Sequence, residues 1–324
     1  MNEDPKRLLE IIVPVFNESQ TIHEFFRRFT NSLSNLEFPN WKISLTLVDD
    51  GSSDSTANEL EVLTKRKYNF DITVLTLSRN FGHQQAVWAG IEHSSQQSCV
   101  LVMDADLQDP PERIADFLRE LENFDVVIAQ RISRQDSFTK RFFASIFYGI
   151  LERLSGGVIR ANVGDFWALS ERAKNTLLKY GEELKFLRGL VSDLGYTVKV
   201  IQYDRDARYA GETHYTIFKM IQLAIAGITG FTIKPLIYTV YIAISISGLL
   251  LPAAFFLAWS RLIGQSVISP GLTFVGVVVI ISISLQFVVM AVLALYVARI
   301  AIEVKKRPVY ILENSYGKSK EDIQ

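Results

Sequence analysis

Cysteine is almost absent from this chain, since Cys99 is the only one among 324 residues. A single cysteine excludes an intrachain disulfide framework and a cysteine-based zinc site. The 4 histidines are scattered along the chain without the spacing of metal ligands. Lys and Arg total 34 against 35 Asp and Glu, so the formal net charge is -1. No excess of positive charge favours nucleic acid, and we expect no nucleic-acid partner.

Two common nucleotide-binding motifs are also missing. No G-x-G-x-x-G follows the first apolar run, at 9–15, which argues against a dinucleotide-binding dehydrogenase. No G-x-x-x-x-G-K-[ST] occurs in the chain, which excludes a P-loop NTPase. No signal peptide opens the sequence either, so we expect the N-terminal part to be cytoplasmic.

Charge disappears from two long stretches near the C-terminus, Pro235 to Ser260 and Leu262 to Ala298. Each is longer than the about 20 apolar residues that a helix needs to cross a bilayer. The sequence therefore predicts two transmembrane helices, at 235–260 and 272–298, joined by a short loop. The alternative is a buried helical hairpin in a soluble core.

Basic residues flank these two stretches on the side that faces the rest of the chain. Lys219 and Lys234 precede the first stretch, Arg299 and 305–307 follow the second, and the loop carries only Arg261. By the positive-inside rule, the N-terminal domain and both termini lie in the cytoplasm, including a tail at 299–324. This predicts a two-span protein of the inner or plasma membrane.

Two further segments have the composition of helices that lie on a membrane surface. Residues 138–154 and 216–234 place apolar side chains at helical spacing with Lys or Arg between them. For the first segment, packing against the soluble core is an equal alternative. For the second, the nearby span favours an interfacial helix.

The first two thirds of the chain alternate strand-like and helix-like runs. The predicted strands lie at 9–16, 43–48, 72–77, 100–103 and 126–129, with helices between them. This alternation predicts an α/β domain over 1–215, with a mostly parallel, Rossmann-like sheet. Polar clusters follow the strands directly, so we expect these clusters to meet at one edge of the sheet.

The most informative cluster is the pair Asp104 and Asp106, which ends the apolar run 99–103. Two hard oxygen ligands at a strand end suit Mg²⁺ or Mn²⁺, which in turn would hold nucleotide phosphates. The alternative is a solvated turn. Further acids follow other strands, namely Glu18, Asp49, Asp50 and Asp109. Crowded carboxylates repel one another, and a divalent cation with a nucleotide diphosphate would relieve that repulsion.

Four motifs, taken in their order along the chain, carry a family resemblance. They are Pro-Val-Phe-Asn-Glu at 14–18, Val-Asp-Asp-Gly-Ser at 48–52, Ser-Arg-Asn-Phe-Gly at 78–82 and Asp-Ala-Asp-Leu-Gln-Asp-Pro-Pro at 104–111. The chain resembles the family-2 glycosyltransferases of GT-A fold. More narrowly, it is similar to the polyprenyl-phosphate glycosyltransferases, which include dolichyl-phosphate mannose synthases and bactoprenol-phosphate glucosyltransferases. Motifs at 162–166 and 208–213 extend the likeness.

The resemblance implies a role for each matching residue. A nucleoside pocket would be lined by Pro14, Phe16, Glu18, Val48 and Asp50. Asp104 would contact the nucleotide and Asp106 and Gln108 would ligate the metal, with Asp104 beside them. Asp165 would lie near the sugar, and Asp104, Asp106 and Asp165 would form the catalytic set. Arg131 and Arg208 would bind the lipid phosphate, with His214 in the same region.

The implied reaction is an inverting, metal-dependent transfer of a sugar from a nucleotide sugar to a membrane polyprenyl phosphate, for a cell-envelope glycan. UDP-glucose is the first donor to consider, and a homo-oligomer is left open. One alternative is a processive polysaccharide synthase, although Q-x-x-R-W is absent. Another is a catalytically weak membrane scaffold or flippase subunit. Two residues depart from the family pattern: Trp167 replaces an Arg and His214 a Lys, so we expect both changes to remove positive charge from the phosphate region.

Overall fold

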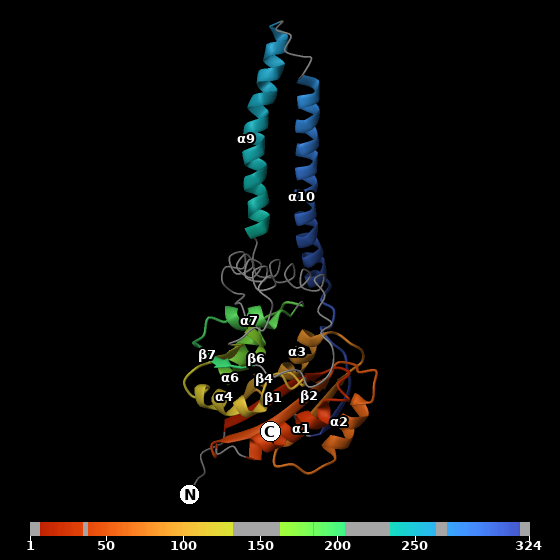
Figure 1. Cartoon of the computed structure of the whole chain (residues 1–324), viewed down its shortest axis with the longest axis vertical. Coiled ribbons are helices and arrows are strands. Elements are labelled where there is room, and N and C mark those ends of the chain that lie inside the picture. The colour runs from red at the N-terminus through yellow and green to blue at the C-terminus, as the bar shows by residue number, and fades with distance from the viewer. Residues whose placement is uncertain are drawn as a thin grey trace.

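The computed structural model describes residues 7–34, 38–131, 163–183, 185–204, 234–263 and 271–317. An α/β domain forms one end of the molecule, and two long helices extend from it (Figure 1). The two predicted surface helices, 138–154 and 216–234, lie outside the described residues apart from Lys234. The same is true of Arg208 and His214.

The domain is built on a mixed sheet, which has eight strands within the described residues, in the order β7-β5-β6-β4-β1-β2-β3-β8. Their bounds are β1 Arg7–Val15, β2 Trp41–Asp49, β3 Asp71–Leu77, β4 Ser98–Val102, β5 Val126–Arg131, β6 Val163–Leu169, β7 Val198–Tyr203 and β8 Leu312–Gly317. Strands β1 to β4 run parallel, and β7 runs parallel to β5. Only β6 and β8 run antiparallel to their neighbours in this sheet.

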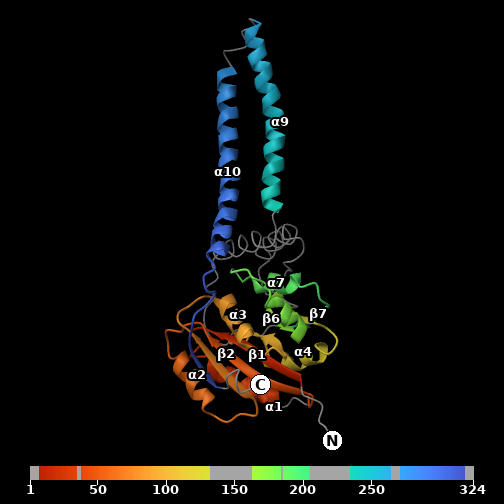
Figure 2. The same cartoon turned by 180° about the vertical axis from the view of Figure 1, so that it is seen from behind.

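Helices cover both faces of this sheet, as Figure 2 shows from behind. One face packs against α1 Ile22–Ser34, α2 Thr56–Thr64 and α4 Ile114–Glu120, which follows a short 3-10 turn η1 at Pro111–Arg113. The other face packs against α3 His83–His93, α6 Glu171–Leu177 and α7 Leu187–Asp193. Strand β1 is apolar on both sides because Leu9, Ile11 and Val13 enter one core and Ile12 enters the other.

A glycine sets the close approach of α3 to the sheet. A Cβ atom added at Gly90 would lie 2.4 Å from Cγ2 of Ile12 and 3.2 Å from Cγ2 of Val48. A larger side chain would therefore push α3 away from β1 and β2. This matters for the site because α3 begins at His83, beside the carboxyl ends of the strands.

The five strands predicted from the sequence are all present, and the mostly parallel α/β sheet is confirmed. Simple alternation of strands and helices does not describe the whole sheet, however. Strand β6 is inserted antiparallel between β4 and β5, pairing Trp167 with both Val102 and Ile128. Strand β8 joins the opposite edge, where Leu312 to Gly317 pair with β3.

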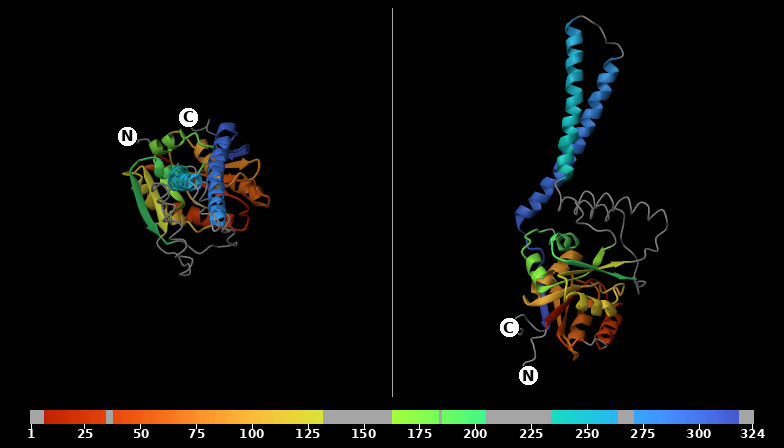
Figure 3. Two further views of the ribbon diagram at one scale, coloured as in Figure 1. Left: turned by 90° about the horizontal axis from the view of Figure 1, so that it is seen from above. Right: turned by 90° about the vertical axis from the view of Figure 1, so that its left-hand side faces the viewer.

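The two long helices are α9 Lys234–Leu262 and α10 Gly271–Lys305. They lie side by side and point away from the α/β domain (Figure 3). Among the described residues, one segment, Ile281–Lys305, is long and apolar enough to cross a membrane by length and composition. Within α9, the apolar stretch Leu236–Ile246 is shorter.

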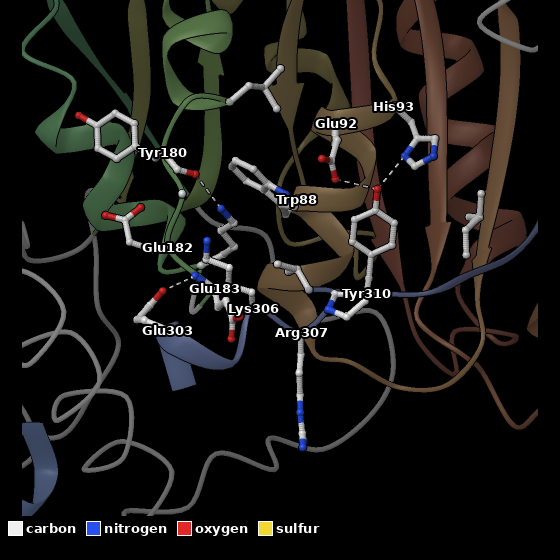
Figure 4. Close-up of a pocket in the computed structure, with 16 residues that line it drawn as sticks. Trp88, Glu92, His93, Tyr180, Glu182, Glu183, Glu303, Lys306, Arg307 and Tyr310 are labelled. Atoms are coloured by element: carbon white, nitrogen blue, oxygen red, sulfur yellow. Dashed lines mark hydrogen bonds between the residues drawn. The ribbon is translucent and has the colours of Figure 1, made fainter. Parts of the chain in front are cut away.

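The chain that leaves α10 returns to the domain instead of forming a free tail. Lys306 adopts a positive φ of 46°, which ends the helix. Further on, the Tyr310 hydroxyl donates to a Glu92 carboxylate oxygen at 2.8 Å and lies 3.2 Å from Nδ1 of His93 (Figure 4). The carbonyl of Ile311 then accepts from the Ser78 amide at 2.9 Å. The segment 306–317 is therefore part of the α/β domain.

Candidate functional site

The predicted nucleoside residues lie at the ends of β1 and β2. Pro14 and Val48 are paired neighbours on these parallel strands, and both are buried. Phe16 follows β1 directly and leaves 43% of its surface exposed. Glu18 is half-buried in the next turn, where its amide donates to Oγ1 of Thr56 at 2.9 Å. The exposed ring of Phe16 thus lies next to the buried ends of β1 and β2.

Asp50 connects this edge to the loop that follows β3. Its carboxylate accepts from the amides of Phe81 at 2.7 Å and Gly82 at 2.9 Å. Burial raises the pKa of Asp50, and these two amides oppose that rise. Gly51 has a φ of 67°, and an added Cβ would lie 2.4 Å from the backbone carbon of Arg79. Glycine is needed here because the two loops touch through their backbones.

The loop after β4 carries the predicted metal-binding residues. Oδ1 of Asp106 accepts from the Gln108 amide at 3.0 Å, and Leu107 between them has a φ of 62°. Asp109 is fully buried and accepts from the Tyr203 hydroxyl at 2.7 Å. Its other oxygen lies 3.5 Å from the amide nitrogen of Asp104. Asp109 therefore braces the loop from inside, while Asp104 and Asp106 are half-buried at its surface.

Asp165 of β6 is paired with two basic residues, Arg188 and His83. Arg188 of α7 donates to it through both arms, Nε to Oδ1 at 2.8 Å and Nη2 to Oδ2 at 2.7 Å. Nε2 of His83 lies 3.1 Å from Oδ2 of Asp165 and 3.7 Å from Oδ1 of Asp104. His83 thus stands between the carboxylates that follow β4 and the carboxylate of β6.

The charges of these groups are strongly coupled. Burial raises the pKa of Asp104 to about 7, and Asp109, Asp106 and Asp165 add to the rise while His83 opposes it. Burial alone would lower the pKa of His83, but Asp104 and Asp165 raise it to about 9. Burial alone would raise the pKa of Asp165, but Arg188 and His83 hold it well below its usual range. These shifts favour an ionised Asp165 beside a protonated His83.

The side chains of the three predicted phosphate-binding residues lie outside the described part of the structure. Arg131 ends β5, and its side chain is not among those described. Arg208 and His214 lie in the segment 205–233, outside the described residues.

Trp167 requires a correction. The expectation was that this residue takes positive charge away from a phosphate region, but its side chain is only 1% exposed and lies in the core that packs against α3, α6 and α7. Strand alternation explains the position, because Trp167 shares a face with Asp165 but sits one pleat deeper in the sheet. Its indole nitrogen has no hydrogen-bond partner among the described residues.

The sequence reading missed two members of the group, His83 and Arg188. His83 directly follows the Ser-Arg-Asn-Phe-Gly motif at 78–82, which was the available signal, although a lone histidine in a polar loop is more often structural. Arg188 belongs to no recognised motif. It reaches the site only because α7 packs against the β6 side of the sheet.

Comparison with known proteins assigns the family. Residues 10–178 match the family described as Glycosyl transferase family 2. The chain is 34% identical over 310 residues to the uncharacterized glycosyltransferase YkcC of Bacillus subtilis, covering 95% of this chain and 94% of that one. It is 31% identical over 311 residues to the SfII prophage-derived bactoprenol glucosyl transferase of Shigella flexneri, covering 95% and 98%. The chain belongs to glycosyl transferase family 2.

Among solved structures, one similar protein is glucosyl-3-phosphoglycerate synthase from Mycobacterium tuberculosis, in complex with Mn²⁺, UDP and glucosyl-3-phosphoglycerate. The TM-score is 0.48 at 17% identity, covering 69% of this chain and 78% of that one. The family match and the mostly parallel sheet described above identify the domain as a GT-A α/β fold.

The oxygen-bearing side chains of the Asp104–Gln108 loop suit a divalent cation that is held only partly by the protein. Among the described residues, no three His, Cys, Asp or Glu side chains are grouped closely enough to cage a metal. Mg²⁺ commonly binds through one or two carboxylates while substrate phosphates and waters complete its shell. The oxygens of Asp104, Asp106 and Gln108 suit a cation held in that way, together with a nucleotide.

Proposed function

We propose that this protein transfers a sugar from a nucleotide sugar to the phosphate of a membrane polyprenyl phosphate. UDP-glucose is the first donor to test. The observation that carries the proposal is the convergence of Asp50, Asp104, His83 and Asp165 at one edge of a family-2 domain. Relatives named bactoprenol glucosyl transferase, matched over 95% of this chain, support the lipid acceptor.

The donor would lie across the ends of β1, β2 and β4. The exposed ring of Phe16 would stack on a base, and Pro14, Val48, Glu18 and Asp50 would line the nucleoside site beside it. Asp106, Gln108 and Asp104 would hold Mg²⁺ or Mn²⁺. Such a cation, when bound, neutralises charge on a leaving diphosphate.

Asp165 would orient a substrate and would not remove a proton. Its pKa lies well below the usual range because Arg188 and His83 surround it, so it is a poor base at pH 7. A phosphate monoester has a second pKa of about 6 and is largely dianionic at neutral pH, so the acceptor needs no strong base. Direct attack by that phosphate would invert the anomeric centre. Arg131, Arg208 and His214 would bind the acceptor phosphate.

The membrane arrangement in this proposal has two spans, with α9 and α10 crossing the bilayer together. Arg299 and the basic residues 305–307 lie at the domain end of α10, which favours a cytoplasmic catalytic domain under the positive-inside rule. A lipid acceptor cannot leave the bilayer, so the spans would keep the site close to the headgroup layer.

The proposal is tested with membranes that contain the protein, undecaprenyl phosphate and a panel of radiolabelled nucleotide sugars. We expect label to move into the lipid phase from one donor, with Mg²⁺ or Mn²⁺ but not with EDTA. Asp106→Asn should abolish this transfer. Asp116→Asn is the matched control, because Asp116 lies on α4 and pairs only with Arg113 and Arg119 among the described contacts. Absence of transfer from every donor would refute the proposal, and a retained anomeric configuration would refute its inverting chemistry.

A further inference from the structure

Arg188 has a contact geometry that goes beyond simple charge pairing. Its guanidinium forms two parallel hydrogen bonds with Asp165, at 2.8 Å and 2.7 Å, which fixes the plane of the carboxylate. The Asp165 side chain is 7% exposed, and that of Arg188 is 34% exposed. The ion pair therefore has a buried acid and a base that reaches the surface of the site.

A second contact connects the two helices beside Asp165, namely α7, which carries Arg188, and α3, which carries His83. The amide of Leu187, the neighbour of Arg188, donates to Oε1 of Gln84 at 2.9 Å. Gln84 in turn follows His83, which lies 3.1 Å from Asp165. The first residues of α3 and α7 are thus held together directly. Arg188 of α7 donates two hydrogen bonds to the carboxylate, and His83 of α3 lies beside it. Such support from packed neighbours is what keeps a site in one geometry.

The described contacts leave the Asp165 carboxylate little capacity to accept further hydrogen bonds. An ionised carboxylate has about four acceptor positions. Arg188 donates one hydrogen bond to each oxygen, and Nε2 of His83 lies 3.1 Å from Oδ2. Among the described residues, Oδ1 has Arg188 as its one donor, which leaves it an acceptor position. A group that donates one hydrogen bond, such as a hydroxyl, matches it.

We propose that Arg188 is a positioning residue that, with His83, aims the remaining acceptor position of Asp165 at one hydroxyl of the transferred sugar. The inference rests on the proposed glycosyl transfer and adds a basis for sugar selection. A site built to hydrogen-bond a hydroxyl strongly rejects the analogue that lacks it, because its polar groups are then left unpaired. Arg188 acts through Asp165, so its effect should vanish when Asp165 can no longer be held.

A double-mutant cycle in the full-length protein tests this dependence. The variants are Arg188→Lys, Asp165→Asn and the pair together, assayed with the donor that the wild type uses. Lysine keeps the charge but loses the two-armed geometry. We expect Arg188→Lys alone to lower kcat/KM roughly 10- to 100-fold, the effect of misplacing a substrate-orienting group. In the Asp165→Asn background the same substitution should lower it no further.

Two more measurements separate positioning from general damage. Affinity for the nucleoside diphosphate alone, which has no sugar, should stay unchanged in Arg188→Lys. The matched control is Arg172→Lys, because Arg172 also holds a carboxylate through two arms, that of Asp125, away from the site. If Arg188→Lys lowers the melting temperature more than Arg172→Lys does, His83→Gln replaces it in the same cycle.

Each outcome has a distinct meaning. Effects that multiply in the double variant, or a loss of nucleoside diphosphate affinity equal to the loss of kcat/KM, would overturn the positioning role. So would an equal loss of transfer in Arg172→Lys. A wild-type protein that transfers no sugar at all would instead overturn the proposed function, which keeps the two failures apart.

Discussion

Replacing Trp167 with Arg introduces the residue that the family pattern places at this position. If the position faced a phosphate, the new guanidinium would strengthen activity. The structure instead places Trp167 in the core, 1% exposed, between Val102 and Ile128 of the neighbouring strands. We therefore expect Trp167→Arg to destabilise the domain without improving transfer.

The size of the effect follows from burial. A buried Trp covers about 150–250 Å², and at about 25 cal/mol per Å² this corresponds to about 4–6 kcal/mol. Burying a charged guanidinium adds several kcal/mol unless a partner is found. Part of this destabilisation is offset. The alkyl stem of Arg still packs, the unpartnered indole N–H is removed, and the guanidinium can pair in part with Asp165. A net loss of about 3 kcal/mol or more is a large fraction of the about 5–15 kcal/mol that stabilises a typical domain.

Calorimetric melting of the purified full-length protein in detergent measures this loss. For a domain of this size, about 3 kcal/mol lowers the melting temperature by about 6–12 °C. The control is Val62→Arg, which places the same side chain on α2 at a residue that is 50% exposed. A Trp167→Arg protein that melts like the wild type and transfers sugar faster would refute the core assignment.

Three other substitutions test the site and its supports. The folded pKa of His83 is about 9, against 6.5 unfolded, so its stabilising contribution is complete below pH 6.5 and is lost as pH rises through 9. Melting temperatures measured from pH 7 to 9.5 should therefore fall less steeply in His83→Gln than in the wild type. Gly51→Ala should weaken nucleotide binding measured by calorimetry, since the left-handed backbone alone costs about 1–2 kcal/mol and the new Cβ meets a backbone atom at 2.4 Å. Gly181→Ala, with no atom within 4 Å of its Cβ, should bind normally. Tyr310→Phe loses its hydrogen bond to Glu92, so the free energy of unfolding should fall by about 1 kcal/mol. An unchanged free energy of unfolding would contradict the anchoring contact.

The features that the sequence predicted share a local cause. Apolar runs that stop at Asp49 and Asp104 mark buried parallel strands, because only a strand covered on both faces is apolar throughout. These signals lie within a few residues of each other in the chain, which makes them readable without a structure.

The features that the sequence did not predict depend on distant packing. Strand β8 reads Leu-Glu-Asn-Ser-Tyr-Gly and is mostly exposed, so it has no apolar periodicity to reveal a strand. Arg188 lies 23 residues from Asp165 in the chain, on a short helix with no motif. The role of Trp167 was misjudged for the same reason, because a motif gives residue order and not the depth of a side chain in the sheet.

The return of the chain from α10 to the sheet connects the apolar helix with the sheet edge that carries Asp50. The carbonyl of Ile311 accepts a hydrogen bond from the Ser78 amide, at the start of the loop after β3. In the same loop, the amides of Phe81 and Gly82 donate to Asp50. Only five residues separate the end of α10 at Lys305 from Ile311. A displacement of α10 relative to the domain would therefore pull on the loop that shapes the site. The C-terminal segment thus stabilises the edge where a donor would bind, as well as the outer strand of the sheet.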